Sequence, residues 1–227
     1  MSDDFCYTML INSLPHHAPL FTSRQTPLSR IRLEQRLSML EDGDAVLLRR
    51  IEHLIQWDYL AMDLSDEQIV RLARVLVEEV PQPPLQEVLD WRMEMRTALA
   101  ALRRRHRGEP APRANEVWGY GRWVGQIQRY WGDPTFGLDH PFPWLRAAHE
   151  LLRAGDSMGL ERLLLELSWN QLERVSGGHY FDFVAVVIYV LKWDIVARWT
   201  SYDGARALGR FNDLVADGLQ GHEAIFA

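Results

Sequence analysis

Residues 181–199 read FDFVAVVIYVLKWDIVARW and form the best candidate for a membrane span in the chain. A helix that crosses a bilayer needs roughly 20 mostly apolar residues. Four charged residues interrupt this stretch, namely Asp182, Lys192, Asp194 and Arg198. Because charges within a bilayer are costly, the pattern predicts a helix that is buried in a protein core. Asp194 and Arg198 have i, i+4 spacing, so we expect them to pair along that helix.

Apolar residues recur at helical spacing along most of the remaining chain. Ser65 and Gln68 form a capping box, which predicts a helix that runs to about Val80. The other predicted helices run from Ser29 to about Leu40, Asp44 to about Met62, Pro84 to about Arg105, Pro143 to Ala154, Met158 to Val175, Asp182 to Ser201 and Asp203 to Gln220. The sequence therefore predicts an all-α fold, a multi-helix bundle of about eight helices. Phe5 to Leu14 is predicted as either a short N-terminal strand or an extended arm.

One internal stretch has the composition of a linker. Residues 107–115 read RGEPAPRAN, which is polar and contains proline. We therefore expect an N-terminal helical region at 1–106, a linker or hinge at 107–117 and a C-terminal helical region at 118–227. Whether the two regions pack as one domain is left open by the sequence.

The overall composition limits the classes of partner. The net charge of -6 argues against nucleic acid, whose phosphates require a concentrated basic surface. Lys192 is the only lysine, so the other basic residues are arginines, which suit carboxylate partners. Cys6 is the only cysteine, which excludes an intrachain disulfide. The acidic start of the chain lacks the pattern of a secretory signal, so we expect a cytoplasmic protein.

Sequence signatures of common enzymes are absent. There is no P-loop, nucleophile elbow, HExxH motif or EF-hand loop. The adjacent pair His16 and His17 is interpreted as part of a solvated loop, and His140, His149 and His179 as local hydrogen-bonding groups. We therefore expect no catalytic residue, no cofactor and no metal.

Two arginine-rich segments are candidates for partner binding. The run at 103–107 is typical of a helix C-terminus, where cations complement the helix dipole, and the alternative is a docking site for an acidic partner. The segment 118–131 interleaves arginine with aromatic residues, as binding hot spots do, although core packing would also explain its tryptophans. The candidate partner-binding residues are Arg103, Arg104, Arg105, Trp118, Arg122, Trp123, Arg129 and Trp131.

The C-terminal pattern resembles a bacterial family of unassigned function, whose genes typically lie within V/A-type ATPase operons. The pattern is Tyr189-x-x-Lys192, followed by Ile195-x-x-Arg198-Trp199. The stretches YTMLINSLP at 7–15, PLS at 27–29, FGL at 136–138 and PWL at 143–145 are also similar to that family. The resemblance implies that the C-terminal pattern is a core motif.

Residues 189–198 are also similar, more weakly, to the closing helix of the funnel subunit of V/A-type ATPases, which is called the d subunit in eukaryotic enzymes. That all-helical funnel sits on the membrane rotor ring and receives the central shaft. This chain is shorter and has no threefold repeat, so the resemblance implies a reduced version or an assembly factor. The expected protein is a non-catalytic adaptor or accessory that contacts shaft and ring subunits, at the inner face of the membrane through protein partners.

Two alternatives from other classes stay open. The first is a stand-alone helical scaffold or regulatory protein that binds another protein. The second is a helical ligand-binding protein or enzyme with a pocket near His140, His149 and His179.

Overall fold

The computed structural model describes residues 6–56, 64–113 and 116–202, and it contains helices but no strand within these ranges. The helices are α1 (Thr8–Ser13), α2 (Arg30–Leu37), α3 (Asp42–Ile55), α4 (Asp66–Glu79), α5 (Pro83–His106), α6 (Val124–Arg129), α7 (Trp144–Ala154), α8 (Ser157–Val175) and a ninth helix at 183–202. The prediction of an all-α bundle is confirmed. The helix predicted at 203–220 lies outside the described residues, as do residues 57–62 of the helix predicted from Asp44.

The N-terminal segment differs from its prediction, because it forms the helix α1 and neither a strand nor an extended arm. Tyr7, Leu10 and Leu14 are buried, and their spacing of three and four residues places them on one helical face. The alternation of apolar and polar residues is too short to distinguish this spacing from that of a strand. The short helix α6 is an element that the sequence does not predict.

Helix boundaries follow the capping residues that the sequence offers. The side chain of Ser29 accepts a hydrogen bond from the third residue of α2, and Ser65 with Gln68 forms the complete capping box of α4. Gly155 ends α7 with φ 69°, a left-handed conformation that glycine adopts without a steric penalty. Asp156 then caps α8 by accepting from the backbone N–H of Gly159.

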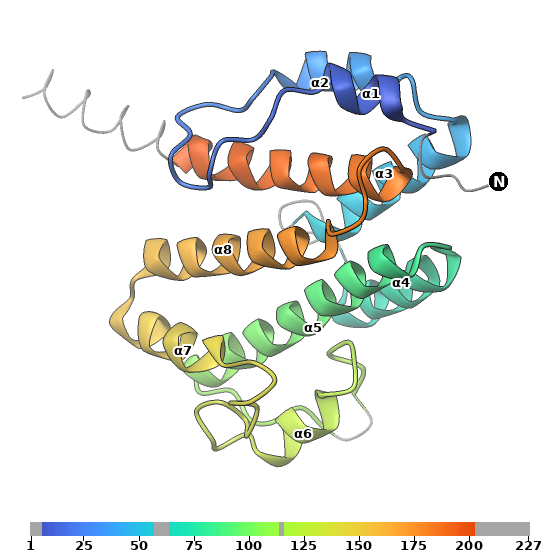
Figure 1. The fold of residues 1–227 in the computed structure, drawn as a ribbon. Helices are drawn as coiled ribbons and strands as arrows, with labels where there is room; N and C mark the ends of the chain where they lie inside the picture. The colour runs from blue at the N-terminus through green and yellow to red at the C-terminus, as the bar shows by residue number, and fades with distance from the viewer. Residues whose placement is uncertain (1–5, 57–63, 114–115, 203–227) are drawn as a thin grey trace, which may run out of the picture.

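The helices are stacked from one end of the molecule to the other (Figure 1). α1 and α2 lie at the top of the view, above the 183–202 helix, and α8 lies below that helix. α5 is the longest helix and contacts α3, α4, α6, α7 and α8. α6 and its flanking loops form the opposite end of the molecule from α2.

The buried apolar side chains form two clusters that share two helices. One cluster combines the N-terminal elements, α3, α4 and the 183–202 helix, and the other is formed around α6 and α7. α5 contributes Leu89 to the first cluster and Leu99 to the second, while α8 contributes Leu172 and Leu164 respectively. The predicted division into regions 1–106 and 118–227 stays a prediction.

The stretch 107–117 is hydrogen-bonded to the segment that follows it. The indole Nε1–H of Trp131 donates to the carbonyl of Glu109 at 3.1 Å, and the amide of Gln128 donates to the carbonyl of Arg113 at 3.0 Å. These bonds attach the connection to the α6 region.

The 183–202 helix is packed on several sides by segments distant in sequence. Tyr7 donates its backbone N–H to the carbonyl of Phe181 at 2.8 Å, just before this helix. The Tyr189 hydroxyl donates to the carbonyl of Pro15 at 2.9 Å, and the Trp193 indole N–H donates to the carbonyl of Leu28 at 2.9 Å. Within the described ranges, no helix combines the length and hydropathy needed to cross a membrane.

Truncation of a buried side chain in the 183–202 helix should destabilise the protein strongly. Ile188 is 3% exposed, so Ile188→Ala is expected to lower the free energy of unfolding by about 2–5 kcal/mol through lost burial and an added cavity. The matched control is Ile31→Ala, at a side chain that is 70% exposed, with an expected change within about 0.5 kcal/mol. Chemical denaturation measures both, and a loss below about 1 kcal/mol at Ile188 would contradict the buried placement.

Candidate functional site: a cavity between four helices

A cavity of about 370 Å³ lies between α3, α5, α8 and the 183–202 helix. Its walls are mostly apolar side chains. Among the lining residues in the described ranges, Trp91 and Tyr202 are aromatic. The apolar lining residues are Ile55, Val88, Trp91, Leu165, Leu172, Leu191 and Ile195. An apolar cavity of this size with a few polar groups is the usual form of a small-molecule site.

Polar side chains reach the cavity from α5, α8, the 183–202 helix and the C-cap of α3. They are Gln56, Arg92, Ser168, Gln171, Asp194, Arg198, Ser201 and Tyr202. Arg92 donates to the Ser168 hydroxyl at 3.1 Å and to the carbonyl of Ile55 at 3.4 Å. Burial lowers the pKa of Arg92 to about 9, and nearby Arg198 and Arg96 act in the same direction. The guanidinium is therefore protonated at neutral pH, and it places a positive charge beside the cavity.

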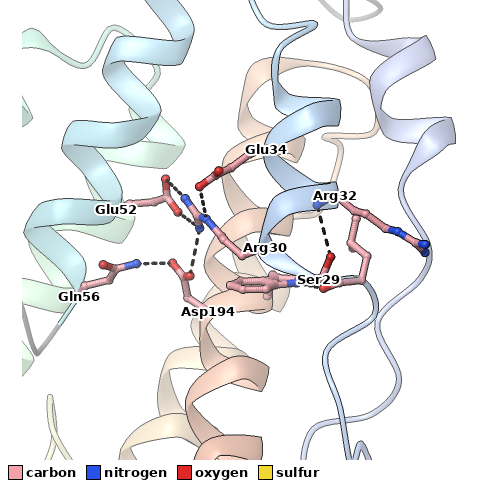
Figure 2. Close-up of polar contacts among 9 residues, drawn as sticks. Ser29, Arg30, Arg32, Glu34, Glu52, Gln56 and Asp194 are labelled. Carbon is pink, nitrogen blue, oxygen red and sulfur yellow. Dashed lines mark hydrogen bonds and ion pairs between the residues drawn. The ribbon is translucent and has the colours of Figure 1, made fainter.

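Asp194 connects the cavity to a network of charged groups (Figure 2). Arg30 at the start of α2 donates to Glu52 of α3 at 2.7 Å and to Glu34 at 2.9 Å, while its Nη1 lies 3.7 Å from the Asp194 carboxylate. The Gln56 amide donates to the other Asp194 oxygen at 3.2 Å. The Arg30 guanidinium is thus close to three carboxylates, and two of these, Glu52 and Asp194, belong to other helices.

The pKa of Asp194 is raised to about 7. Burial is the main cause and the nearby Glu52 charge adds to it, while the hydrogen bond from Gln56 and the charge of Arg30 act in the opposite direction. Arg30 lies closer to Glu52 than to Asp194, which explains why it does not offset the burial. Near pH 7 the cavity therefore holds a carboxyl group that exchanges readily between its neutral and charged forms.

Gln171 lines the cavity and is 8% exposed. Its Oε1 accepts from Arg174 at 3.3 Å, but its buried Nε2 has no hydrogen-bond partner in the described part of the chain. A buried amide without a partner normally costs free energy. Of the buried side-chain atoms in the described ranges that lack a partner, this nitrogen is the one that belongs to a residue of the cavity wall.

The arginines predicted as one partner-binding run have different environments. Arg103 is exposed, whereas Arg104 pairs with Glu109 at 3.1 Å and Glu116 at 3.2 Å and lies over the Trp118 ring. Arg105 donates to the carbonyls of residues 133 and 134 and lies 4.9 Å from the centre of the Phe136 ring. Phe136 is fully buried with φ 56°, so Arg105 supports a strained turn.

The tryptophans of the second predicted segment face inward. Trp118 is 3% exposed, so its prediction as a partner contact is wrong for this structure, because the ring is part of the core. Trp123 is half-buried and donates to Glu94 at 3.2 Å, and Trp131 packs against Phe136. Core packing, the alternative explanation, is confirmed for these rings.

The remaining arginines of that segment are at the surface. Arg122 and Arg129 are both exposed, at either end of α6, and Tyr130 beside them is 50% exposed. Their prediction as partner contacts stays a prediction.

The C-terminal motif residues belong to the 183–202 helix and contact several of its neighbours. Ile195 and Arg198 line the cavity, and Arg198 also pairs with Glu161 of α8. Trp199 meets Phe21 edge to face, with ring centres 4.7 Å apart.

Tyr189 and Lys192 belong to a second contact of the same helix. The Tyr189 ring packs on His17 with 4.4 Å between ring centres. Lys192 pairs with Glu173 at 2.9 Å and lies 5.3 Å from the centre of the Trp169 ring. These contacts join the 183–202 helix to α8 and to the N-terminal loop.

Two local interpretations of the sequence need correction. The expected pair between Asp194 and Arg198 does not form, because Asp194 contacts Gln56 and Arg30 while Arg198 contacts Glu161. His17 is half-buried against Tyr189 and Trp169, and therefore is not a solvated loop residue.

The three histidines that the sequence offers for a pocket, His140, His149 and His179, do not line the cavity. His149 contacts Arg105, and His179 pairs with Asp182 at 2.5 Å before the 183–202 helix. The described residues also contain no group of three or more histidine, cysteine, aspartate or glutamate side chains arranged to hold a metal ion.

Sequence reasoning misses Gln56, Arg92 and Gln171, because single polar residues within amphipathic helices have no motif. The one available signal is the charge at Asp194 within an otherwise apolar helix. Comparison of the chain with protein-family models, curated proteins and solved structures finds no match.

The raised pKa of Asp194 predicts a pH dependence of stability. A carboxyl whose folded pKa is about 7, above its ordinary 3.8, favours folding fully below pH 3.8 and loses that contribution as the pH rises through 7. Asp194→Asn removes this effect. The free energy of unfolding of the variant, minus that of the natural protein, should therefore rise by roughly 2–4 kcal/mol between pH 4 and pH 8.

Denaturant unfolding at several pH values measures this difference. The subtraction cancels the contributions of the other titrating groups to stability. The matched control is Asp139→Asn, which makes the same substitution at an exposed carboxylate. A difference between Asp194→Asn and the natural protein that is constant with pH would show that Asp194 titrates normally.

Proposed function

We propose that the protein is a non-catalytic component or accessory of a bacterial V/A-type ATPase, a helical adaptor that resembles the funnel subunit and lies between the central shaft and the membrane rotor ring. The proposal begins from the sequence resemblance, and one structural observation supports it. The separated stretches that carry the resemblance are in contact with one another or are buried in the core.

The N-terminal and C-terminal stretches of the resemblance form one unit. Tyr7 lies against Phe183 with ring centres 6.5 Å apart, in addition to its backbone bond to Phe181. Pro15 and Leu28 accept from Tyr189 and Trp193 through their carbonyls. A chance likeness of short motifs would not be expected to select residues that contact each other across the whole chain.

The internal stretches of the resemblance are also structural. Phe136, Leu138, Trp144 and Leu145 are all buried in the second core cluster. The resemblance is therefore carried by residues that define the fold, which favours a shared architecture. Because architecture alone does not determine function, the assignment to the ATPase depends on a direct test of partners.

The surface around α6 is the candidate contact with a partner. Arg122, Arg129 and Tyr130 are exposed there, and arginine and tyrosine are frequent at binding hot spots. The exposed Arg103 belongs to the neighbouring end of α5. Arg104 and Arg105 are engaged within the protein, so they are poor choices for a test of binding.

The test is affinity purification of the tagged protein from its native host in mild detergent, followed by mass spectrometry. We expect recovery of shaft and ring subunits in fixed proportion. The double variant Arg122→Glu/Arg129→Glu should reduce that recovery by about tenfold or more, as loss of hot-spot contacts does. Recovery of none of these subunits, with the ATPase intact elsewhere in the lysate, would reject the proposal.

The matched control is Arg32→Glu, a charge reversal at an exposed arginine of α2. α2 lies at the opposite end of the molecule from α6 (Figure 1), so recovery should be unchanged. Equal recovery with the double variant and the control would place the contact on another surface.

A further inference from the structure

The cavity between α3, α5, α8 and the 183–202 helix is a feature that an adaptor role does not require. A folded core of ordinary packing leaves few voids larger than a water molecule, yet this one measures about 370 Å³. In other proteins an apolar cavity of roughly 150 Å³ is large enough to bind benzene. The space here therefore admits a larger organic molecule, of the size that ordinary ligand pockets hold.

Most of the cavity wall presents hydrocarbon to a ligand. All four helices contribute apolar side chains to it: Ile55 from α3, Val88 and Trp91 from α5, Leu165 and Leu172 from α8, and Leu191 and Ile195 from the 183–202 helix. Contact with such a wall favours an apolar molecule, because binding removes hydrocarbon surface from water on both sides of the contact.

The polar side chains of the wall are already engaged within the protein. Arg92 donates to the Ser168 hydroxyl at 3.1 Å, and that hydroxyl donates to the carbonyl of Leu164 at 2.8 Å. The Gln56 amide donates to the Asp194 carboxylate at 3.2 Å. These contacts belong to the folded chain itself and need no ligand.

The other polar wall residues also have partners. Arg198 pairs with Glu161 and donates to the Tyr202 hydroxyl at 3.2 Å, while Ser201 donates to the carbonyl of Arg198 at 2.7 Å. Gln171 accepts from an arginine three residues further along α8 at 3.3 Å. A charged ligand would therefore compete for groups that are already hydrogen-bonded, and burial of its charge would carry a large desolvation cost.

We infer that the cavity binds an uncharged, mainly hydrocarbon molecule that is larger than benzene. Such a ligand gains free energy by leaving water for the apolar walls, and it leaves the polar contacts of the wall intact. Because the cavity lies where four helices meet, a ligand there stabilises their packing against one another. The ligand thereby links the stability of the fold to its own concentration.

Three probes with chains of eight carbons and different head groups test the charge of the ligand. We titrate 1-octanol, octanoate and octylammonium into the purified full chain by calorimetry at pH 7. Octanol should bind with a stoichiometry of one and about tenfold or more tightly than either ion, because only the ions lose the hydration of a charge. Its binding should show a negative heat-capacity change, the mark of apolar burial, and should raise the melting temperature.

A wall substitution tests the location of the ligand. Val88 is 4% exposed and lines the cavity, so the larger ring of Val88→Phe should fill the space and abolish octanol binding. Circular dichroism shows whether this variant is folded. The matched control is Val75→Phe, which makes the same substitution at a valine of α4 that is 43% exposed, and it should leave octanol affinity within about twofold.

A brominated probe locates the ligand even if Val88→Phe does not fold. Bromine quenches indole fluorescence on contact, so 8-bromo-1-octanol should quench the protein through Trp91, which lines the cavity. Trp91→Phe keeps an aromatic wall and should lose most of that quenching. The matched control is Trp131→Phe, at a second half-buried tryptophan in the other core cluster, and it should retain the quenching.

Several outcomes would overturn the proposed ligand site. They are the absence of saturable octanol binding up to its solubility, binding of either ion as tightly as octanol, octanol binding by folded Val88→Phe as in the natural protein, and quenching that Trp91→Phe leaves unchanged. All of these measurements use the protein without partners, so they are independent of its association with the ATPase.

Discussion

The structure depends on the burial of a single helix whose sequence is not wholly apolar. The 183–202 helix contains the valines Val186, Val187 and Val190, which are completely buried, but it also carries a lysine, an aspartate and an arginine. Burial is possible because each of these side chains has a partner on another element: Lys192 pairs with Glu173 and Arg198 with Glu161, while Asp194 accepts a hydrogen bond from Gln56 and lies 3.7 Å from Arg30. Buried charges are tolerated when they are paired in this way. The same pairs determine which segments can pack around the helix, since a shifted register would leave the charges unpaired.

Much of the fold could be predicted from the sequence because its signals are local. Capping residues such as Ser65 and Asp156, helix breakers such as Gly155, and apolar residues at helical spacing act within a few positions of one another. The segment at 6–14 is the exception, since six helical residues provide fewer than two turns from which to recognise a period. The tryptophans at 118, 123 and 131 show a different limit. Their composition fits a binding surface and a core equally, and only the three-dimensional packing distinguishes the two.

The candidate site could not be predicted, because it is built from single residues on four helices. The hydrogen-bonded residues Gln56 and Asp194 are 138 positions apart in the sequence. Neither they nor the other polar wall residues Arg92 and Gln171 belong to a recognisable motif. Asp194 is visible as a charge in an apolar stretch, and Arg198 is an oppositely charged residue one turn further along the helix. In the structure each of the two side chains contacts a different element instead, and the packing of the helices determines these contacts. Long-range pairing of this kind is outside the reach of periodicity and spacing in one sequence.

The contacts between the N-terminal segment and the 183–202 helix have a consequence for how the chain acquires its structure. The bonds from Trp193 to Leu28 and from Tyr189 to Pro15 close loops of 165 and 174 residues. Contacts between residues so distant in sequence form slowly, because the entropy of loop closure is lost before the contact is gained. During synthesis the segment around Tyr7 to Leu28 leaves the ribosome long before the 183–202 helix exists. The segment from Tyr7 to Leu28 is thus among the first parts of the chain to be made and among the last to reach its final environment, and its apolar side chains stay exposed in the interval.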